Sequence, residues 1–144
     1  MAQSISTRTP AIHLGRNGRD GQVLVYGEGN EKFLLTVQEA IKACGAYSTI
    51  AQFQTQMQEL TELLSKWTTD RKRLVRDAYL SVKGGGLFFL VVMAGKEFDP
   101  DLEDELTALD IEIANSAEFD LLRLDVQAIP DSPPDCVDSF LTAN

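Results

Sequence analysis

The sequence contains few of the residues from which catalytic and metal sites are commonly built. Its 144 residues include two cysteines and one histidine. Cys44 and Cys136 are far apart, and neither has a second cysteine or a histidine at the spacing of a structural zinc site. His13 lies in a glycine-rich stretch, which argues against a Ser/His/Asp or Cys/His catalytic arrangement. We therefore predict no metal, no cofactor and no disulfide framework, and a reducing, cytoplasmic location.

Long apolar runs are also missing. The longest, Leu87 to Gly95, has the length of a strand, whereas a helix that spans a membrane needs about 18 apolar residues. The first ten residues lack the apolar centre of a secretory signal. We therefore expect a soluble protein without a membrane partner.

Lysine and arginine are almost absent from the C-terminal third of the chain. Residues 97–144 carry one of them against 14 Asp and Glu, whereas residues 1–96 carry 12 against eight. The overall charge is −9. Such asymmetry affects partners and association rates rather than the fold. Because phosphates and carboxylates repel each other, we do not expect nucleic acid to be the main partner.

The remaining composition is typical of one globular domain. The chain is 44% hydrophobic and 24% charged, and a domain of this size buries roughly two thirds of its unfolded surface. We divide it into a flexible glycine-rich arm at residues 1–30, a single α+β domain at 31–129 and a proline-rich tail at 130–144. In the arm, the apolar pieces Ala11 to Leu14 and Gln22 to Tyr26 flank an Asn-Gly turn signal and predict a short hairpin.

Two helices are predicted at the start of the domain. The first runs from an N-cap at Asn30 to Cys44, and Gly45 ends it in the left-handed conformation. The second begins near Ser48 and has apolar residues at intervals of three and four, which is a heptad pattern. We expect the two helices to pack as a hairpin, which would explain this seam without a partner. The apolar positions of the seam are Ile50, Phe53, Met57, Leu60, Leu64 and Trp67.

Three strands are predicted after these helices. Residues 73–82 alternate between apolar and polar positions, although Arg76 on the apolar side leaves a helical start at 70–78 as an alternative. Residues 87–94 are apolar on both sides, as in a central strand. Residues 119–128 alternate again, which is typical of a strand nearer the edge of a sheet.

A third helix between the last two strands completes the predicted fold. Asp99 and Pro100 provide its N-cap and first turn, and apolar residues at helical spacing extend to Ile113. Strand, helix and strand in this order form a crossover unit. The predicted fold class is α+β: a two-layer domain whose small mixed sheet, made of a β-hairpin and a β-α-β crossover, is covered by the helical hairpin and this acidic helix. Gln22 to Tyr26 is a candidate for an additional edge strand.

This acidic helix, at residues 99–112, carries much of the negative charge. Carboxylates in its first turn gain roughly 0.3 to 1 kcal/mol each from the helix dipole, but Asp110 and Glu112 lie beyond that turn and no lysine is placed to pair with them. Three interpretations remain open: a solvated face, a docking face for a basic protein, or a hard-cation site, for which the usual calcium loop is missing. The candidate docking residues are Asp101, Asp104, Glu105, Asp110 and Glu112.

A basic patch at the first strand has the opposite charge. It lies between Asp70 and Asp77 and consists of Arg71, Lys72, Arg73 and Arg76. Four cations within six residues resemble a phosphate-contact patch, but the interleaved aromatics of a single-strand nucleic-acid binder are missing. We therefore favour a solvated segment or an internal partner for the acidic helix. The glycines at 84–86 are interpreted as a hairpin turn, because a strand rather than a helix follows them.

The sequence leads to three hypotheses about function. The first is a non-enzymatic cytoplasmic interaction or regulatory module that docks a basic protein partner through the acidic helix at residues 99–112. The second is a small-molecule-binding protein or enzyme with a pocket between the helical hairpin and the sheet. The third is a homo-oligomeric structural subunit, such as a homodimer, joined through the seam between Ile50 and Trp67 or through a sheet edge.

Overall fold

The computed structural model describes residues 11–14, 31–83 and 85–141. The Asn-Gly turn of the predicted hairpin, the candidate edge strand Gln22 to Tyr26, the N-cap Asn30 and the first of the three glycines lie outside these residues.

The described residues form a four-stranded mixed sheet, which confirms the predicted α+β class. Its strands are β1 (Ala11–His13), β2 (Val75–Lys83), β3 (Gly86–Met93) and β4 (Leu124–Ile129), and they lie in this order across the sheet. β1 pairs antiparallel with β2, and β2 with β3. β4 pairs parallel with β3, as the crossover requires. The sheet therefore contains the hairpin and the β-α-β unit that the sequence predicted.

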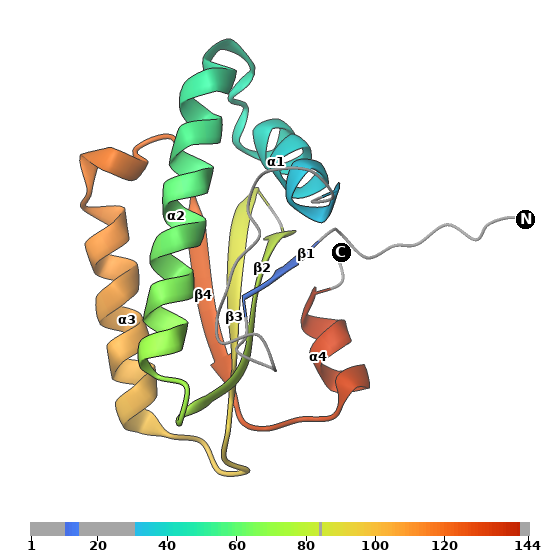
Figure 1. Cartoon of the computed structure of the whole chain (residues 1–144), viewed down its shortest axis with the longest axis vertical. Coiled ribbons are helices and arrows are strands. Elements are labelled where there is room, and N and C mark those ends of the chain that lie inside the picture. Colours follow the sequence, from blue (N-terminus) through green and yellow to red (C-terminus); the bar gives the residue numbers. More distant parts are fainter. Residues whose placement is uncertain (1–10, 15–30, 84, 142–144) are drawn as a thin grey trace, which may run out of the picture.

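Helices cover both faces of the sheet (Figure 1). The helices α1 (Glu31–Cys44), α2 (Ile50–Asp70) and α3 (Pro100–Ala114) pack on one face, together with the larger hydrophobic core. The short α4 (Pro134–Leu141) packs on the other face through Val137 and Leu141. Two of the elements, β1 and α4, come from the stretches predicted as an arm and a tail.

The heptad seam of α2 is used within the chain. Phe53, Met57, Leu60 and Leu64 are fully buried against the sheet and the neighbouring helices. Trp67 meets Phe89 of β3 edge to face, with ring centroids 6.0 Å apart. Five of the six seam residues therefore belong to the core, whereas Ile50 at the start of α2 is 43% exposed.

Local sequence signals fix the ends of α1 and α3 as expected. Gly45 has φ +64°, and the N–H groups of Gly45 and Ala46 donate to the carbonyls of Lys42 and Ile41, which is a Schellman motif. At α3, the Asp99 carboxylate accepts from two backbone N–H groups of the first turn, at 3.0 and 3.3 Å. Both ends depend only on neighbouring residues, which explains why the sequence predicted them.

Two predicted strand boundaries are wrong. β2 begins at Val75 rather than residue 73, because the chain makes a turn after α2 in which the N–H groups of Leu74 and Val75 donate to the Arg71 carbonyl. β4 begins at Leu124 rather than residue 119, because Ala117–Phe119 form a 3-10 turn, η2, in which the N–H of Glu118 donates to the Ser116 hydroxyl. No strand forms at 119–123, although the inward alternation of Leu124 to Ala128 is as predicted.

Gly86 allows the close approach of β3 and β4. The N–H of Leu87 donates to the carbonyl of Arg123 at 2.7 Å, and a Cβ on Gly86 would lie 2.7 Å from the same carbonyl oxygen. A real side chain is not tolerated at that distance, so the parallel pairing depends on this glycine.

We therefore expect Gly86→Ala to lower the free energy of unfolding by about 1 to 3 kcal/mol, because the strands must separate to admit the methyl group. Gly95→Ala is the matched control, since its nearest atom would be 3.8 Å away. Urea denaturation measures both variants. Equal stabilities of the two would contradict the close approach.

Candidate functional site

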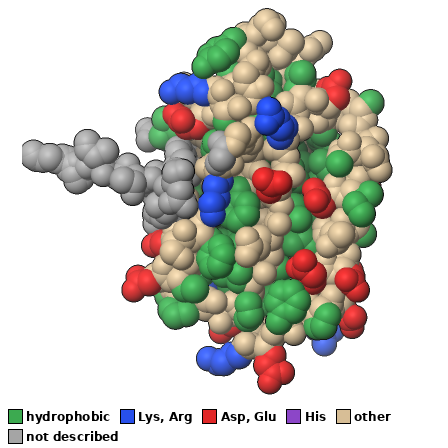
Figure 2. Space-filling model, turned by 180° about the vertical axis from the view of Figure 1, so that it is seen from behind, with side chains coloured by type: hydrophobic (Ala, Val, Ile, Leu, Met, Phe, Trp, Pro, Cys, Tyr) green, Lys and Arg blue, Asp and Glu red, His purple; other side chains and the backbone are tan. Residues whose placement is uncertain are grey.

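The five acidic residues predicted as a docking face do not share one surface. Asp101 and Asp104 are exposed on α3. Glu105 is held by Arg71, Asp110 lines a cleft beside β4, and Glu112 lines a groove against α2. Glu105 and Glu112 thus lie on the side of α3 that faces α2, whereas Asp110 lies on the side that faces β4. In Figure 2, which shows the molecule from behind, acidic side chains follow the side on which α3 lies.

Part of the charge asymmetry is neutralised between elements. Arg71, at the end of α2, donates from Nε to Glu105 Oε1 at 2.6 Å and also donates to the Trp67 carbonyl at 3.1 Å. Its guanidinium lies 4.4 Å from the centre of the Trp67 ring, which adds a cation–π contact. Arg71 is thus an internal partner of the acidic helix, as one interpretation of the sequence proposed.

The structure also divides the predicted basic patch. Lys72 and Arg73 are exposed in the turn between α2 and β2, and neither forms an ion pair within the described chain. A β-bulge separates Arg76 from the patch. Val75 pairs with Met93 and Asp77 pairs with the adjacent Val92, so Arg76 between them has no partner in the ladder. The bulge explains why Arg76 broke the alternation of the strand.

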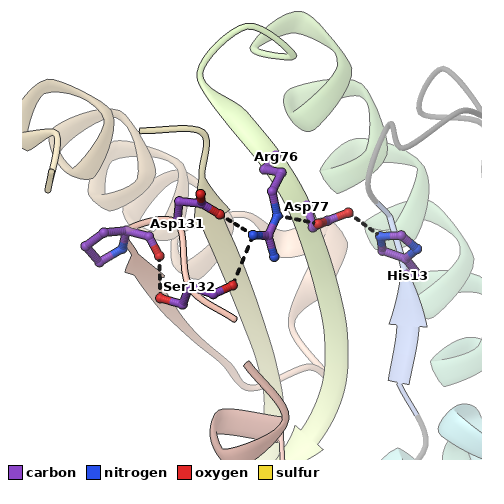
Figure 3. A network of polar contacts seen from close by, with 6 residues as sticks. His13, Arg76, Asp77, Asp131 and Ser132 are labelled. Atoms are coloured by element: carbon purple, nitrogen blue, oxygen red, sulfur yellow. Dashed lines mark hydrogen bonds and ion pairs between the residues drawn. The ribbon is translucent and has the colours of Figure 1, made fainter. Parts of the chain in front are cut away.

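The bulge directs Arg76 into a polar network at one end of the sheet (Figure 3). Its Nε donates to Asp77 Oδ2 at 2.8 Å, and its NH1 donates to the Ser132 carbonyl at 3.0 Å and to the Asp131 carboxylate. On the other side, His13 Nε2 lies 2.8 Å from Asp77 Oδ1. The network thereby joins β1, β2 and the loop after β4.

Asp77 is the centre of this network. The residue is only 6% exposed, and its two carboxylate oxygens accept from different partners. Burial acts to raise the pKa of Asp77, but the hydrogen bonds and positive charges of His13 and Arg76 outweigh it and hold the pKa below its ordinary value. The pKa of Arg76 is raised despite burial, because Asp77 and Asp131 favour its charged form.

The polar side chains in and beside this network bind one another or the backbone. His13 stacks on Tyr79, with ring centroids 4.7 Å apart, and its Nε2 is occupied by Asp77. The nearby Ser132 hydroxyl donates to the Pro130 carbonyl at 2.7 Å. Among the described residues, no hydroxyl or thiol is hydrogen-bonded to His13.

We expect Asp77→Asn to destabilise the protein by about 1 to 3 kcal/mol at neutral pH, because Arg76 loses a charged partner. Because the pKa of Asp77 is lower in the folded state, its ionised carboxylate adds to the free energy of unfolding. This stabilisation is fully present above the unfolded pKa of about 4 and is lost as the pH falls through the folded pKa. The difference between the wild type and the variant should therefore shrink in acid. Urea denaturation between about pH 7 and pH 3 measures it. A difference that stays constant down to acid pH would contradict this assignment.

A cleft of about 500 Å³ lies where the β2–β3 hairpin, the end of α3 and the start of β4 meet. Gly85, Arg123 and the carboxylates of Asp110, Asp120 and Asp125 are among its lining residues. Asp120 accepts from Gln56 of α2 at 2.9 Å. Burial, and then the charge of Asp125, raise the pKa of Asp110.

Asp110→Asn is therefore expected to stabilise the protein slightly at neutral pH, by about 0.5 kcal/mol. Because the pKa of Asp110 is higher in the folded state, ionisation of its carboxyl group lowers the free energy of unfolding. This loss is absent below the unfolded pKa and develops as the pH rises through the folded pKa. The amide of asparagine does not ionise, so the variant avoids the loss. The control is Asp104→Asn, at an exposed position on the same helix. Melting curves at about pH 7 and pH 3 test it: a gain that persists in acid, or no gain at neutral pH, would refute the assignment.

A second concave surface, the acidic groove, lies between α2 and α3 and has a volume of about 480 Å³. Its apolar lining residues are Leu63, Ile113 and Phe119. Among the described residues that line it, Lys66 is the only cation, and it pairs with Asp70 at 3.3 Å. The acids of the groove come from α2, α3 and η2, and they are Glu59, Glu62, Glu112 and Glu118.

Sequence reasoning found only Glu112 of these four glutamates. Glu59 and Glu62 are on the face of α2 opposite the buried seam, where they resemble ordinary solvated residues. Glu118 lies just before the strand that was predicted at residues 119–128. The convergence of the four glutamates depends on how α2 packs beside α3, which no local sequence pattern reveals.

Comparison with known proteins adds no assignment. No family model, no curated protein and no solved structure matches the chain. In the part of the chain that the structure describes, no helix is both long and apolar enough to cross a membrane. Within the same residues, no group of three or more His, Cys, Asp or Glu side chains could hold a metal ion.

Proposed function

We propose that this protein is a non-enzymatic interaction module that binds a basic segment of a protein partner in the acidic groove. The observation that carries the proposal is the convergence of four glutamates from three elements on one groove, where Lys66, the one cation among the described lining residues, is paired with Asp70. Glu59, Glu112 and Glu118 are exposed and form no ion pair within the described residues. Their charge is therefore available to a ligand.

The apolar residues of the groove favour lysine and arginine side chains as ligands. These side chains place their aliphatic stems on apolar surface while the charged group stays at the rim. Leu63, Ile113 and Phe119 provide such a surface between the glutamates of α2 and those of α3 and η2. A segment that alternates basic and apolar residues would therefore fit the groove better than a uniformly basic one.

The negative charge of the whole protein would increase the rate of association. A net charge of −9 attracts a basic partner over a distance of about one Debye length, roughly 8 Å at physiological salt. Binding of this kind weakens as salt increases. We place the module in the cytoplasm, which is supported by the two free cysteines, Cys44 and Cys136.

The test uses a fluorescent peptide of about 12 residues that alternates lysine and leucine, with binding measured by anisotropy at about 0.05 and 0.2 M salt. In the groove variant, Glu59→Gln/Glu112→Gln/Glu118→Gln, we expect the Kd to rise about tenfold, because three ion pairs of about 0.5 kcal/mol each are lost. All three positions are exposed, so the fold should be retained, as circular dichroism can check.

The matched control is Glu97→Gln/Asp101→Asn/Asp104→Asn, which removes three exposed charges outside the groove. Its Kd should stay within about twofold of the wild type. An equal loss in both variants would show that net charge alone attracts the peptide. Failure of the wild type to bind at low salt would exclude the proposal.

A further inference from the structure

The turn between α2 and β2 has the chemistry that the acidic groove would recognise. Lys72, Arg73 and Leu74 follow one another there, and Leu74 is 43% exposed. The loop between β3 and α3 lies beside this turn at the lower end of Figure 1 and adds Lys96 and Phe98, which is 48% exposed. Hydrophobic, basic and acidic side chains all reach the surface at this end in Figure 2, and the exposed Glu97 lies between Lys96 and Phe98. The basic end is the name used here for Lys72, Arg73, Leu74, Lys96 and Phe98.

Two acids near the basic end are already neutralised within the molecule. Asp70 pairs with Lys66 at 3.3 Å, and Glu105 pairs with Arg71 at 2.6 Å. Lys72 and Arg73 form no ion pair within the described chain. Within the described residues, each molecule therefore has two cations without an ion pair beside an exposed leucine at one end, and Glu59, Glu112 and Glu118 without an ion pair in the groove.

We propose that the partner is a second copy of this chain, whose basic end docks in the acidic groove. The inference rests on the proposed function, because it uses the same groove. Charge complementarity supports it: Lys72 and Arg73 would meet the groove glutamates, and Leu74 would contact the apolar residues between them. The copies would associate head to tail.

The positions of the two surfaces determine the type of assembly. The groove lies between α2 and the C-terminal half of α3, whereas the basic end lies where α2 ends and α3 begins. One molecule can therefore use both surfaces at the same time. A contact between unlike surfaces is heterologous, so it produces chains or rings rather than a closed twofold dimer.

The overall charge restricts the conditions under which this association occurs. Two copies that each carry −9 repel each other at long range, and this repulsion is screened at about 0.15 M salt, where the Debye length is roughly 8 Å. Pairs in direct contact are screened less. Association should therefore be measurable at physiological salt and at protein concentrations of about 0.1 mM or more.

Sedimentation velocity of the full chain provides the test, with a complementation design. The groove variant described above keeps its basic end, and the end variant, Lys72→Gln/Arg73→Gln, keeps its groove. We expect the wild type to exceed the mass of a dimer as its concentration increases. Each variant alone should weaken association at least about tenfold, and an equal mixture of the two should restore a dimer and nothing larger. Lys42→Gln/Arg123→Gln changes the charge equally at other exposed positions and should assemble as the wild type does.

The outcomes separate this inference from the proposed function. A wild type that remains monomeric, or a mixture that does not recover the dimer, overturns the second copy as the partner. If the groove still binds the lysine–leucine peptide in that case, the proposed function stands. If the wild type assembles and the groove variant assembles equally well, the head-to-tail contact is wrong, whatever the peptide result.

Discussion

Burial of β3 on both faces is the constraint on which the rest of the structure depends. All eight residues from Gly86 to Met93 are buried. Leu87, Phe89 and Val91 belong to the core beneath α1, α2 and α3, whereas Phe88, Leu90 and Val92 pack against α4. Each such side chain contributes about 1.5 to 3 kcal/mol when it leaves water, so a sheet covered on one face alone would lose much of this stabilisation. The central strand therefore requires a helical layer on each side.

Polar interactions then connect the ends of the sheet. The β-bulge leaves Arg76 without a partner in the ladder. The Arg76 guanidinium donates both to Asp77 and to the loop that follows β4. Asp77 in turn binds His13, so the three-residue strand β1 is connected to the sheet by a side-chain contact as well as by its ladder. A buried carboxylate with two cationic or hydrogen-bonding partners is stable where an unpaired one would not be. The network thus positions a short edge strand and the approach to α4.

The charge asymmetry of the sequence is partly internal and partly a property of the surface. Arg71 and Arg76 pair with acids of other elements, which neutralises half of the predicted basic patch. The acidic surplus is distributed over the outer face of α3, the cleft at Asp110 and the groove against α2. In the groove, four glutamates from three elements surround apolar residues, and the lining cation Lys66 pairs with Asp70. The cleft at Asp110 also combines acids with apolar residues, but Arg123 is among its lining residues. We therefore propose the groove rather than the cleft as the site for a basic ligand.

The sequence alone determined what depends on neighbouring residues. The heptad seam of α2, the Asp99 cap, the Gly45 stop and the apolar strand β3 follow from side-chain spacing and local hydrogen bonds, and the structure contains them all. Only the tertiary structure decided that Arg76 is bulged, that His13 meets Asp77, and that Glu59 and Glu118 face the same groove as Glu112. These residues are tens of positions apart, and their contacts depend on how the helices and strands pack. Charge has no period along the chain that would reveal such contacts in advance.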